Sequence, residues 1–249
     1  MCTNLSLKKM ENHFLHLLCN GKKMLNADGE IRMRTLVIGD LHCPADHEDY
    51  LHFCLDMKRK YKTNNTVFIG DIIDHEAISA HDKNPALPGP VDELAQAREG
   101  VRKWYSAFKN ASVCIGNHDA RVQKKAVKNG IPEIYLKSYC DVYHTPHWTW
   151  DYSFEFNGVY YVHGDGWGGQ YPAFNAAKAR LQSVVCGHHH SLAAINWIKG
   201  PNTMYFGMNV GCGVDQQHAA LAYSKPHLKK AILSCGIVID GEQPYLEIM

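Results

Sequence analysis

The stretch TLVIGDLH, residues 35–42, places an apolar run directly before a glycine, an aspartate and a histidine. A short, nearly continuous apolar run of this kind predicts a strand that is buried on both faces. The glycine lets the backbone turn sharply, so Asp40 and His42 should follow the carboxyl end of that strand. The stretch therefore predicts an α/β fold with ligand-type side chains at a strand end.

Apolar runs also precede ligand-type side chains in TVFIGDIID (66–74), SVCIGNHD (112–119), VYYVHGD (159–165) and SVVCGHHH (183–190), and a glycine follows the run at once in all but VYYVHGD. Polar side chains at the carboxyl ends of neighbouring strands collect on one rim of a sheet. Carboxylate, imidazole and amide oxygen together suit divalent metals such as Mn, Zn or Fe. Seven side chains are candidate metal ligands: Asp40, His42, Asp71, Asn117, His163, His188 and His190.

The composition is that of an ordinary globular protein. The chain has 249 residues, of which 45% are hydrophobic and 20% charged, and its net charge of +1 neither favours nor excludes nucleic acid. Nine cysteines without a Cys-x-x-Cys pair predict free thiols in a reducing compartment. No run approaches the roughly 20 apolar residues of a membrane span. We therefore expect a cytoplasmic protein, in the host cytoplasm if a phage encodes it.

Outside the motifs, the chain divides into two parts. Residues 1–30 predict an N-terminal extension with a short helix, and residues 31–249 predict a single domain. Apolar residues at helical spacing indicate helices near 50–61 and 94–108, the second beginning near Asp92 as its N-cap. Two strand-helix units in succession favour a parallel sheet.

Aromatic and polar residues alternate strictly from Trp148 to Phe156, which predicts one strand of a hairpin. Asn157-Gly158 is the preferred dipeptide of a tight turn, so the second strand should deliver His163. Further strands are expected at 203–210, 231–239 and 245–248. We expect the aromatic stripe in the core, with a platform for stacking nucleic-acid bases as the alternative.

In this order, the motifs Asp-x-His, Gly-Asp-x-x-Asp, Gly-Asn-His-Asp, His and Gly-His-x-His resemble the full signature of calcineurin-like metallophosphoesterases. The resemblance extends from about residue 34 to the C-terminus. It implies a four-layer αββα sandwich, in which two mixed β-sheets are flanked by helices and the metal site lies at the strand C-terminal ends. Details around Asp74 and Asn117 look most like small phage and bacterial metallophosphoesterases. Protein serine/threonine phosphatases usually have Arg-Gly where this chain has His75-Glu76, and purple acid phosphatases have Tyr at Asp74.

The resemblance implies two divalent metal ions, for which Mn is expected and Zn, Fe, Ni or Mg are alternatives. By analogy, Asp71 bridges the ions, and a hydroxide between them attacks the phosphorus atom. Two sets of ligands follow from the family pattern: Asp40, His42 and His190 for the first ion, and Asn117, His163 and His188 for the second.

His118 is left without a metal in this allocation, so it is the candidate catalytic side chain that stabilises charge or protonates the leaving oxygen. Asp119 is placed with it at the catalytic centre. Asp119 and Asp74 are expected to act from behind the ligands by orienting imidazoles, and Asp165 to do so beside His163. Two further residues are candidates for substrate contact: Arg121 and His75.

The resulting hypothesis is a metal-dependent phosphodiesterase acting on DNA, RNA or a nucleotide. A phosphomonoesterase and a non-catalytic scaffold of the same fold remain alternatives. Neither a membrane nor an obligate protein partner is expected. Four basic groups would form a nucleic-acid track if they shared one face, and would otherwise only solvate helices: Lys58-Arg59-Lys60, Arg98-Arg102-Lys103, Arg121-Lys124-Lys125-Lys128 and Lys225-Lys229-Lys230.

Overall fold

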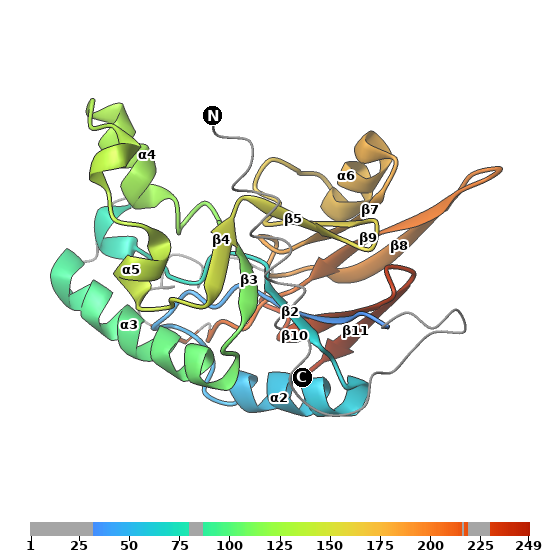
Figure 1. Ribbon diagram of the computed structural model, residues 1–249, viewed down its shortest axis with the longest axis horizontal. Helices are drawn as coiled ribbons and strands as arrows, with labels where there is room; N and C mark the ends of the chain where they lie inside the picture. Colours follow the sequence, from blue (N-terminus) through green and yellow to red (C-terminus); the bar gives the residue numbers. More distant parts are fainter. Residues whose placement is uncertain (1–31, 80–86, 216, 219–229) are drawn as a thin grey trace.

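The computed structural model describes residues 32–79, 87–215, 217–218 and 230–249. The helix expected within residues 1–30 lies outside this part of the chain. Two mixed β-sheets pack face to face, and helices cover their outer faces (Figure 1). The αββα sandwich expected from the motifs is confirmed.

The first sheet has the strand order β11-β10-β1-β2-β3-β4. Its strands β1 to β4 run parallel, whereas β10 and β11 pair antiparallel on the other side of β1. Parallel neighbours need crossover connections, and helices supply the first two of them. The strands are β1 (Arg34–Ile38), β2 (Asn65–Phe68), β3 (Ala111–Cys114), β4 (Trp148–Asp151), β10 (Ser234–Ile239) and β11 (Gln243–Ile248).

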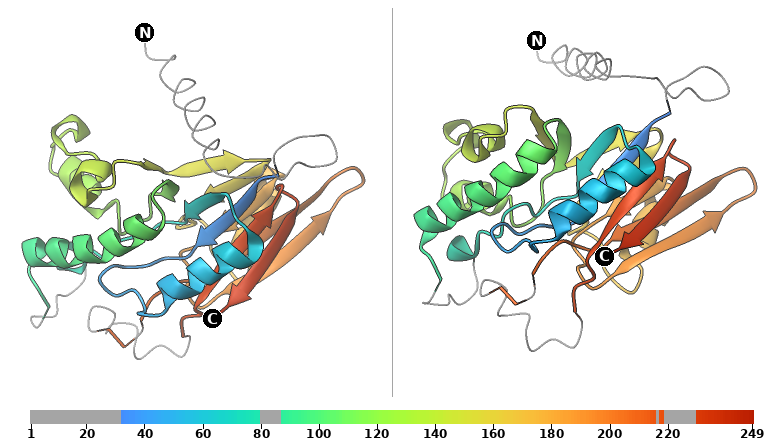
Figure 2. Two further views of the ribbon diagram at one scale, coloured as in Figure 1. Left: turned by 60° about the horizontal axis from the view of Figure 1, so that its bottom comes forward. Right: turned by 90° about the horizontal axis from the view of Figure 1, so that it is seen from below.

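The crossover helices are α2 (Tyr50–Tyr61) and α3 (Pro90–Ala107), which lie together along the outer face of the first sheet (Figure 2). The expectation that Asp92 caps α3 is wrong, because the helix begins at Pro90 with Gly89 as its N-cap. Proline suits the first helical position, since its missing N–H has no partner there in any case. Asp92 lies in the first turn, where its negative charge interacts favourably with the partial positive charge at the helix N-terminus.

The second sheet has the order β5-β6-β7-β9-β8, in which β6, β7 and β9 run parallel. Its strands are β5 (Ser153–Phe156), β6 (Val159–Val162), β7 (Ser183–Cys186), β8 (Ala193–Lys199) and β9 (Met204–Val210). Helix α6 (Pro172–Arg180) packs on its outer face through small alanine side chains. Within the described chain, no helix has both the length and the apolar character needed to cross a membrane.

The aromatic stripe is not one strand. It breaks at the exposed Tyr152, so that β4 joins the first sheet beside β3 and β5 joins the second beside β6. Trp148 accordingly packs under the helices, and Phe156 packs between the sheets. The Asn157-Gly158 turn forms as expected, with both residues in the left-handed region. Alternation with period two specifies which side chains share a face, but it does not specify which sheet they join.

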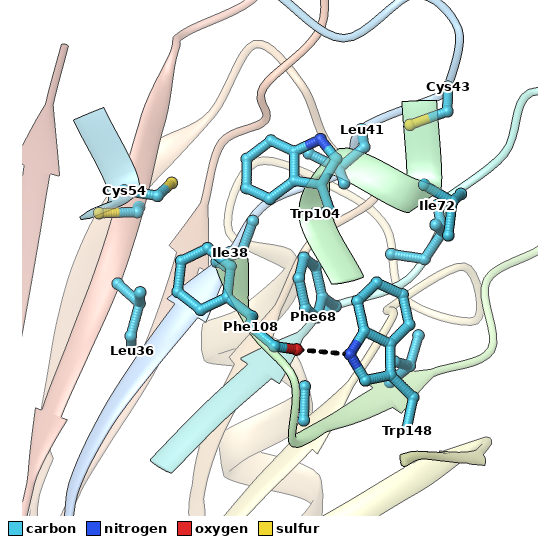
Figure 3. Packing of buried hydrophobic residues seen from close by; sticks show 14 of the residues in the cluster. Leu36, Ile38, Leu41, Cys43, Cys54, Phe68, Ile72, Trp104, Phe108 and Trp148 are labelled. Carbon is cyan, nitrogen blue, oxygen red and sulfur yellow. Dashed lines mark hydrogen bonds between the residues drawn. The ribbon is translucent and has the colours of Figure 1, made fainter. Parts of the chain in front are cut away.

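A large aromatic cluster fixes α3 to the first sheet (Figure 3). The ring of Phe68 packs edge-on against Trp104 and Phe108 and lies 4.7 Å from Trp148, measured between ring centroids. The Trp148 indole Nε1 donates a hydrogen bond of 2.7 Å to the Phe108 carbonyl, so its polar atom is satisfied in the core. This packing holds β2 and β3 in place, the two strands that lead into Asp71 and Asn117.

The described cysteines are seven free thiols, as expected. Burial raises the pKa of Cys186 to about 12 and raises that of Cys114 well above its ordinary value. Both thiols therefore stay protonated near neutral pH and pack as small apolar side chains.

Candidate metal centre

All five motifs follow strand ends on one rim of the molecule. Strands β1, β2 and β3 of the first sheet and β6 and β7 of the second each end within three residues of a predicted ligand. Within the described chain, three groups of side chains bring ligand atoms within 4.8 Å of one another. They are Asp40, His42 and His190; His42, Asp71 and His118; and Asp71, His163 and His188.

The first group joins the end of β1 to the loop after β7. His190 Nε2 lies 3.1 Å from Asp40 Oδ2 and 3.2 Å from His42 Nε2. His42 Nδ1 lies 2.8 Å from Asp74 Oδ1, so this nitrogen donates to the carboxylate and leaves the Nε2 lone pair for a metal. These three ligand atoms match one of the two expected sets.

The third group, with Asn117 beside it, joins the ends of β2 and β3 to the ends of β6 and β7. His163 Nε2 lies 3.1 Å from Asp71 Oδ2, 3.0 Å from Asn117 Oδ1 and 3.2 Å from His188 Nδ1. The other ring nitrogen, Nδ1, donates to the Ile69 carbonyl at 3.1 Å, which orients Nε2 toward the centre. Four ligand atoms therefore converge as the second set requires.

Asp71 lies between the two groups. Its Oδ1 accepts a 2.8 Å hydrogen bond from the His118 backbone N–H. Its Oδ2 is left to face His163 at 3.1 Å and His42 Nε2 at 3.6 Å. A single oxygen atom thus faces ligands of both groups, which is the geometry that a shared ligand needs.

The side chains fit a pair of divalent ions. Asp40 Oδ1 is buried and has no hydrogen-bond partner among the described residues, although such an oxygen would ordinarily be satisfied. The same oxygen is enclosed closely, since a Cβ at Gly187 would lie 2.3 Å from it. Imidazole nitrogens, carboxylates and one amide oxygen form a donor set typical of Mn, Zn or Fe. A cation would satisfy Asp40 and separate the crowded imidazoles.

The protonation states favour metal binding at most ligands. Burial lowers the pKa of His42, and burial with the nearby His163 charge lowers that of His188 to about 4, so both rings are neutral near pH 7. Burial alone would raise the pKa of Asp71, but His163 and His118 hold it well below 3.8. Burial would lower the pKa of His163, yet Asp71 and Asp40 raise it to about 10. His163 must therefore lose a proton when a metal binds.

Three ligands lie on unusual backbone. His42, Asp71 and His188 have φ values of 50°, 49° and 63°, in the left-handed region that side chains other than glycine rarely adopt. Each such residue costs about 1–2 kcal/mol. Strain of this kind persists where the surrounding structure enforces it, and it concentrates at functional sites.

Glycines next to the ligands leave no room for a side chain. A Cβ on Gly116 would lie 2.1 Å from Asp71 Oδ1 and 2.4 Å from the Asp71 nitrogen. Gly116→Ala should therefore displace Asp71 and weaken Mn²⁺ binding by about 10- to 100-fold, as loss of a supporting contact does at metal sites. Titration calorimetry measures the affinity. Gly168→Ala is the matched control, because nothing lies within 4 Å of its Cβ position; equal effects of the two substitutions would contradict the prediction.

His118 faces the centre from the loop after β3. Its Nδ1 lies 2.8 Å from the Asp74 carbonyl oxygen and 3.1 Å from Asp74 Oδ1. Its Nε2 lies 4.0 Å from Asp71 Oδ2 and 3.2 Å from a nitrogen of Arg121. Asp74 thus contacts both His42 and His118 and holds their ring orientations.

Asp119 is fully buried, and its carboxylate accepts backbone N–H groups. Oδ1 lies 3.0 Å from Ile72 N and 3.3 Å from Ile73 N, and Oδ2 lies 2.9 Å from Gly116 N. Burial and the Asp71 charge raise the pKa of Asp119 to about 7. The carboxylate ties the loop after β2 to the loop after β3, so Asp119 supports the ligands and does not reach the rim.

The two predicted substrate contacts have partners inside the protein. Arg121 donates to the carbonyls of Asp74 at 2.9 Å and His75 at 3.0 Å, and its side chain is 17% exposed. His75 is buried, with Nδ1 donating to the His118 carbonyl at 3.0 Å. Its Nε2 lies 3.1 Å from the Tyr143 hydroxyl. Both side chains brace the loop that carries Asp74 and His118.

The structure does not bring Asp165 against the His163 ring. Its side chain is 44% exposed, and Oδ2 lies 4.0 Å from Lys124 Nζ. Lys124 belongs to α4 (Arg121–Lys128), the helix that follows the Gly-Asn-His-Asp motif. Asp165 therefore links the loop after β6 to α4 at the edge of the centre.

Sequence reasoning did not find several supporting residues. The buried Tyr50 hydroxyl accepts the Gly39 N–H at 3.1 Å and donates to the Ser234 carbonyl at 2.6 Å, which fixes the backbone before Asp40. Glu93 on α3 accepts the Glu76 and Ala77 N–H groups and so caps η1 (Glu76–Ile78) after Asp74. These contacts join residues that are far apart in the sequence, so no local sequence pattern predicts them.

The chain matches a protein-family model. The family model described as calcineurin-like phosphoesterase matches residues 33–210, a range that contains all seven candidate ligands. Comparison with curated proteins found no significant match.

Among solved structures, the chain is similar to vacuolar protein sorting 29 from Cryptosporidium parvum, at 14% identity over 88% of this chain and 97% of that one, with a TM-score of 0.44. It is also similar to YfcE, a phosphoesterase from E. coli, at 15% identity over 82% of this chain and 87% of that one, with a TM-score of 0.40. Vps29 from Chaetomium thermophilum matches at 14% identity over 87% and 97%, with a TM-score of 0.38. Because the family model matches well over half of the chain, the protein belongs to the calcineurin-like phosphoesterase family.

Proposed function

We propose that this protein is a phosphodiesterase that depends on two divalent metal ions. The observation that carries the proposal is the position of Asp71 Oδ2, which faces His163 Nε2 at 3.1 Å and His42 Nε2 at 3.6 Å. One carboxylate oxygen thereby lies close to ligand atoms of both sets. Two ions bound there would activate a water molecule as the nucleophile and neutralise the phosphoryl oxygens.

The first ion would be held by Asp40, His42 and His190, and the second by Asn117, His163 and His188, with Asp71 shared. Asp74 keeps the His42 and His118 rings in place through contacts of 2.8 and 3.1 Å between its Oδ1 and their Nδ1 atoms. His118 Nε2 then points toward the centre, where it can donate a proton or hydrogen bond to the leaving oxygen. The Arg121 charge beside this nitrogen favours transfer of the proton away from it.

The charges around the centre support the proposed preference for a diester. A phosphomonoester is a dianion near neutral pH, so it needs more compensating positive charge than a diester does. The residue after Asp74 is His75, which is buried, and burial lowers its pKa, so it brings no positive charge to the phosphate. One guanidinium nitrogen of Arg121 donates hydrogen bonds to two backbone carbonyls, those of Asp74 and His75. A singly charged diester suits this site better.

A substrate panel tests the proposal on the full chain supplied with Mn²⁺. We expect kcat/KM to be higher on bis-p-nitrophenyl phosphate than on p-nitrophenyl phosphate, and about two metal ions per chain by elemental analysis. A higher kcat/KM on the monoester would favour a phosphomonoesterase. A chain that binds no metal, and that added Mn²⁺ does not activate, would favour a non-catalytic scaffold.

A further inference from the structure

The strongest unexplained feature is a row of basic side chains on α4. Arg121, Lys124, Lys125 and Lys128 occupy positions i, i+3, i+4 and i+7, so they lie on one side of the helix, here called the basic face of α4. The three lysines are exposed. From residue 121 to 137 the sequence has five basic side chains and one acidic side chain, Glu133.

Helix stability accounts for only two residues of this row, Lys125 and Lys128, which lie in the last turn, where positive charge interacts favourably with the helix dipole. A helix N-terminus carries partial positive charge, so cations there are unfavourable and acidic side chains are favoured. Helix α4 nevertheless begins with Arg121, has Lys124 in the next position of the row, and has no acidic residue in its first turn. A local conflict of this kind is typical of residues retained for function.

The basic face of α4 begins at the metal centre. An Arg121 guanidinium nitrogen lies 3.2 Å from His118 Nε2, and Lys124 Nζ lies 4.0 Å from Asp165 Oδ2, two residues after the ligand His163. From there the helix leads away from the two sheets (Figure 1). Seven residues at 1.5 Å each make the row about 10 Å long.

We propose that the basic face of α4 binds the backbone of single-stranded nucleic acid and leads it to the metal centre. The inference rests on the proposed phosphodiester chemistry, and it names a polynucleotide as the substrate class. The row presents several positive charges along one side of α4, and it begins beside the site that would cut a phosphodiester. A single strand is favoured because the ligands Asp40, His42 and Asp71 are buried, and a flexible chain enters such a site more readily than a duplex.

Exposed aromatic rings near α4 agree with this substrate. The side chain of Tyr135, in η2 (Glu133–Tyr135), is 78% exposed, and that of Tyr152 is 56% exposed. Such rings provide surfaces on which bases stack. Exposed aliphatic side chains also occur here, at Val127 and Ile134. These are features of membrane-binding surfaces, so the experiment below includes vesicles.

The test measures binding of a fluorescein-labelled oligothymidylate by anisotropy. Phosphorothioate linkages slow its hydrolysis, so the full chain can be used with Mn²⁺. In Lys124→Gln/Lys128→Gln, Kd should rise about tenfold, and the slope of log affinity against log salt concentration should become shallower by about 0.7 for each lost contact. Lys62→Gln/Lys103→Gln removes the same charge from exposed positions beyond α4 and should change Kd less than about twofold.

Further outcomes separate the inference from folding and from the proposed function. Lys124→Arg/Lys128→Arg retains the charge and should keep Kd within about twofold of wild type; a loss as large as that of the glutamine pair would overturn the inference. If the protein hydrolyses bis-p-nitrophenyl phosphate but the oligonucleotide Kd of the glutamine pair is unchanged, the inference is overturned and the proposed phosphodiesterase function is unaffected. The wild-type protein could instead hydrolyse no diester while the glutamine pair still loses oligonucleotide affinity. That result would contradict the proposed function and leave the nucleic-acid-binding surface supported. Loss of binding to phosphatidylserine vesicles without loss of oligonucleotide binding would assign the surface to a membrane instead.

Discussion

Asp71→Asn should lower kcat/KM on bis-p-nitrophenyl phosphate by about 10³-fold and reduce the bound metal from about two ions per chain to one or fewer. The reason is that Asp71 Oδ2 faces both sets of ligands, so one substitution weakens the binding of both ions. The amide also removes the carboxylate's negative charge, which attracts both cations. Elemental analysis and steady-state kinetics on the same preparation measure the two effects together.

Asp56→Asn is the matched control for this variant, since Asp56 is an exposed carboxylate on α2 and lies outside the ligand groups. It should leave both metal content and kcat/KM near wild type. The shared-ligand geometry would be refuted by an Asp71→Asn protein that retains two ions and loses less than about tenfold in kcat/KM. Retention of one ion with the large loss of activity would show that the two sites are separable but act together.

His118→Ala should lower kcat by about 10²- to 10⁴-fold while both metal ions stay bound. His118 Nδ1 is held by Asp74, and Nε2 is directed toward Asp71 at 4.0 Å, so the ring faces the reacting groups. The loss should be larger on a dinucleotide than on bis-p-nitrophenyl phosphate. A nucleoside leaving group needs a proton, whereas p-nitrophenolate leaves readily without one.

Metal analysis of this variant also separates two roles for His118. Its ligand atom lies within 4.8 Å of those of His42 and Asp71, so the geometry alone would also allow it to bind a metal. Loss of one ion in His118→Ala would make it a ligand. Equal losses of kcat on the two substrates would contradict a role in protonating the leaving group. His144→Ala serves as the control, because His144 is exposed and ends α5 (Tyr139–Tyr143).

Much of the strand framework could be predicted because its signals are local. The five apolar runs before the motifs are strands, and they bring the seven candidate ligands to one rim as expected. The hairpin turn at Asn157-Gly158 also follows from local backbone preference. The split of the aromatic stripe at Tyr152 could not be predicted, since alternation looks the same whether both halves join one sheet or two.

The roles of neighbouring polar residues were less predictable. His75 and Arg121 stand beside metal-site motifs and have the chemistry of phosphate contacts, yet both are used to brace the loop of Asp74. Asp165 lies two residues after a ligand but pairs with Lys124. Sequence spacing places such residues near the centre without specifying the direction of each side chain. That direction depends on hydrogen-bond partners such as Tyr143, which lies 68 positions from His75.

The sequence by itself therefore determined which side chains are of ligand type and which strands they follow. Those properties are local, because strand patterning and turn formation depend on near neighbours. Only the tertiary structure decided that Asp71 turns a single oxygen to both groups, that Asp119 is sealed behind the loops, and that α4 presents a basic face beside the centre. These outcomes depend on packing between segments far apart in the chain, where burial and hydrogen-bond satisfaction select one arrangement.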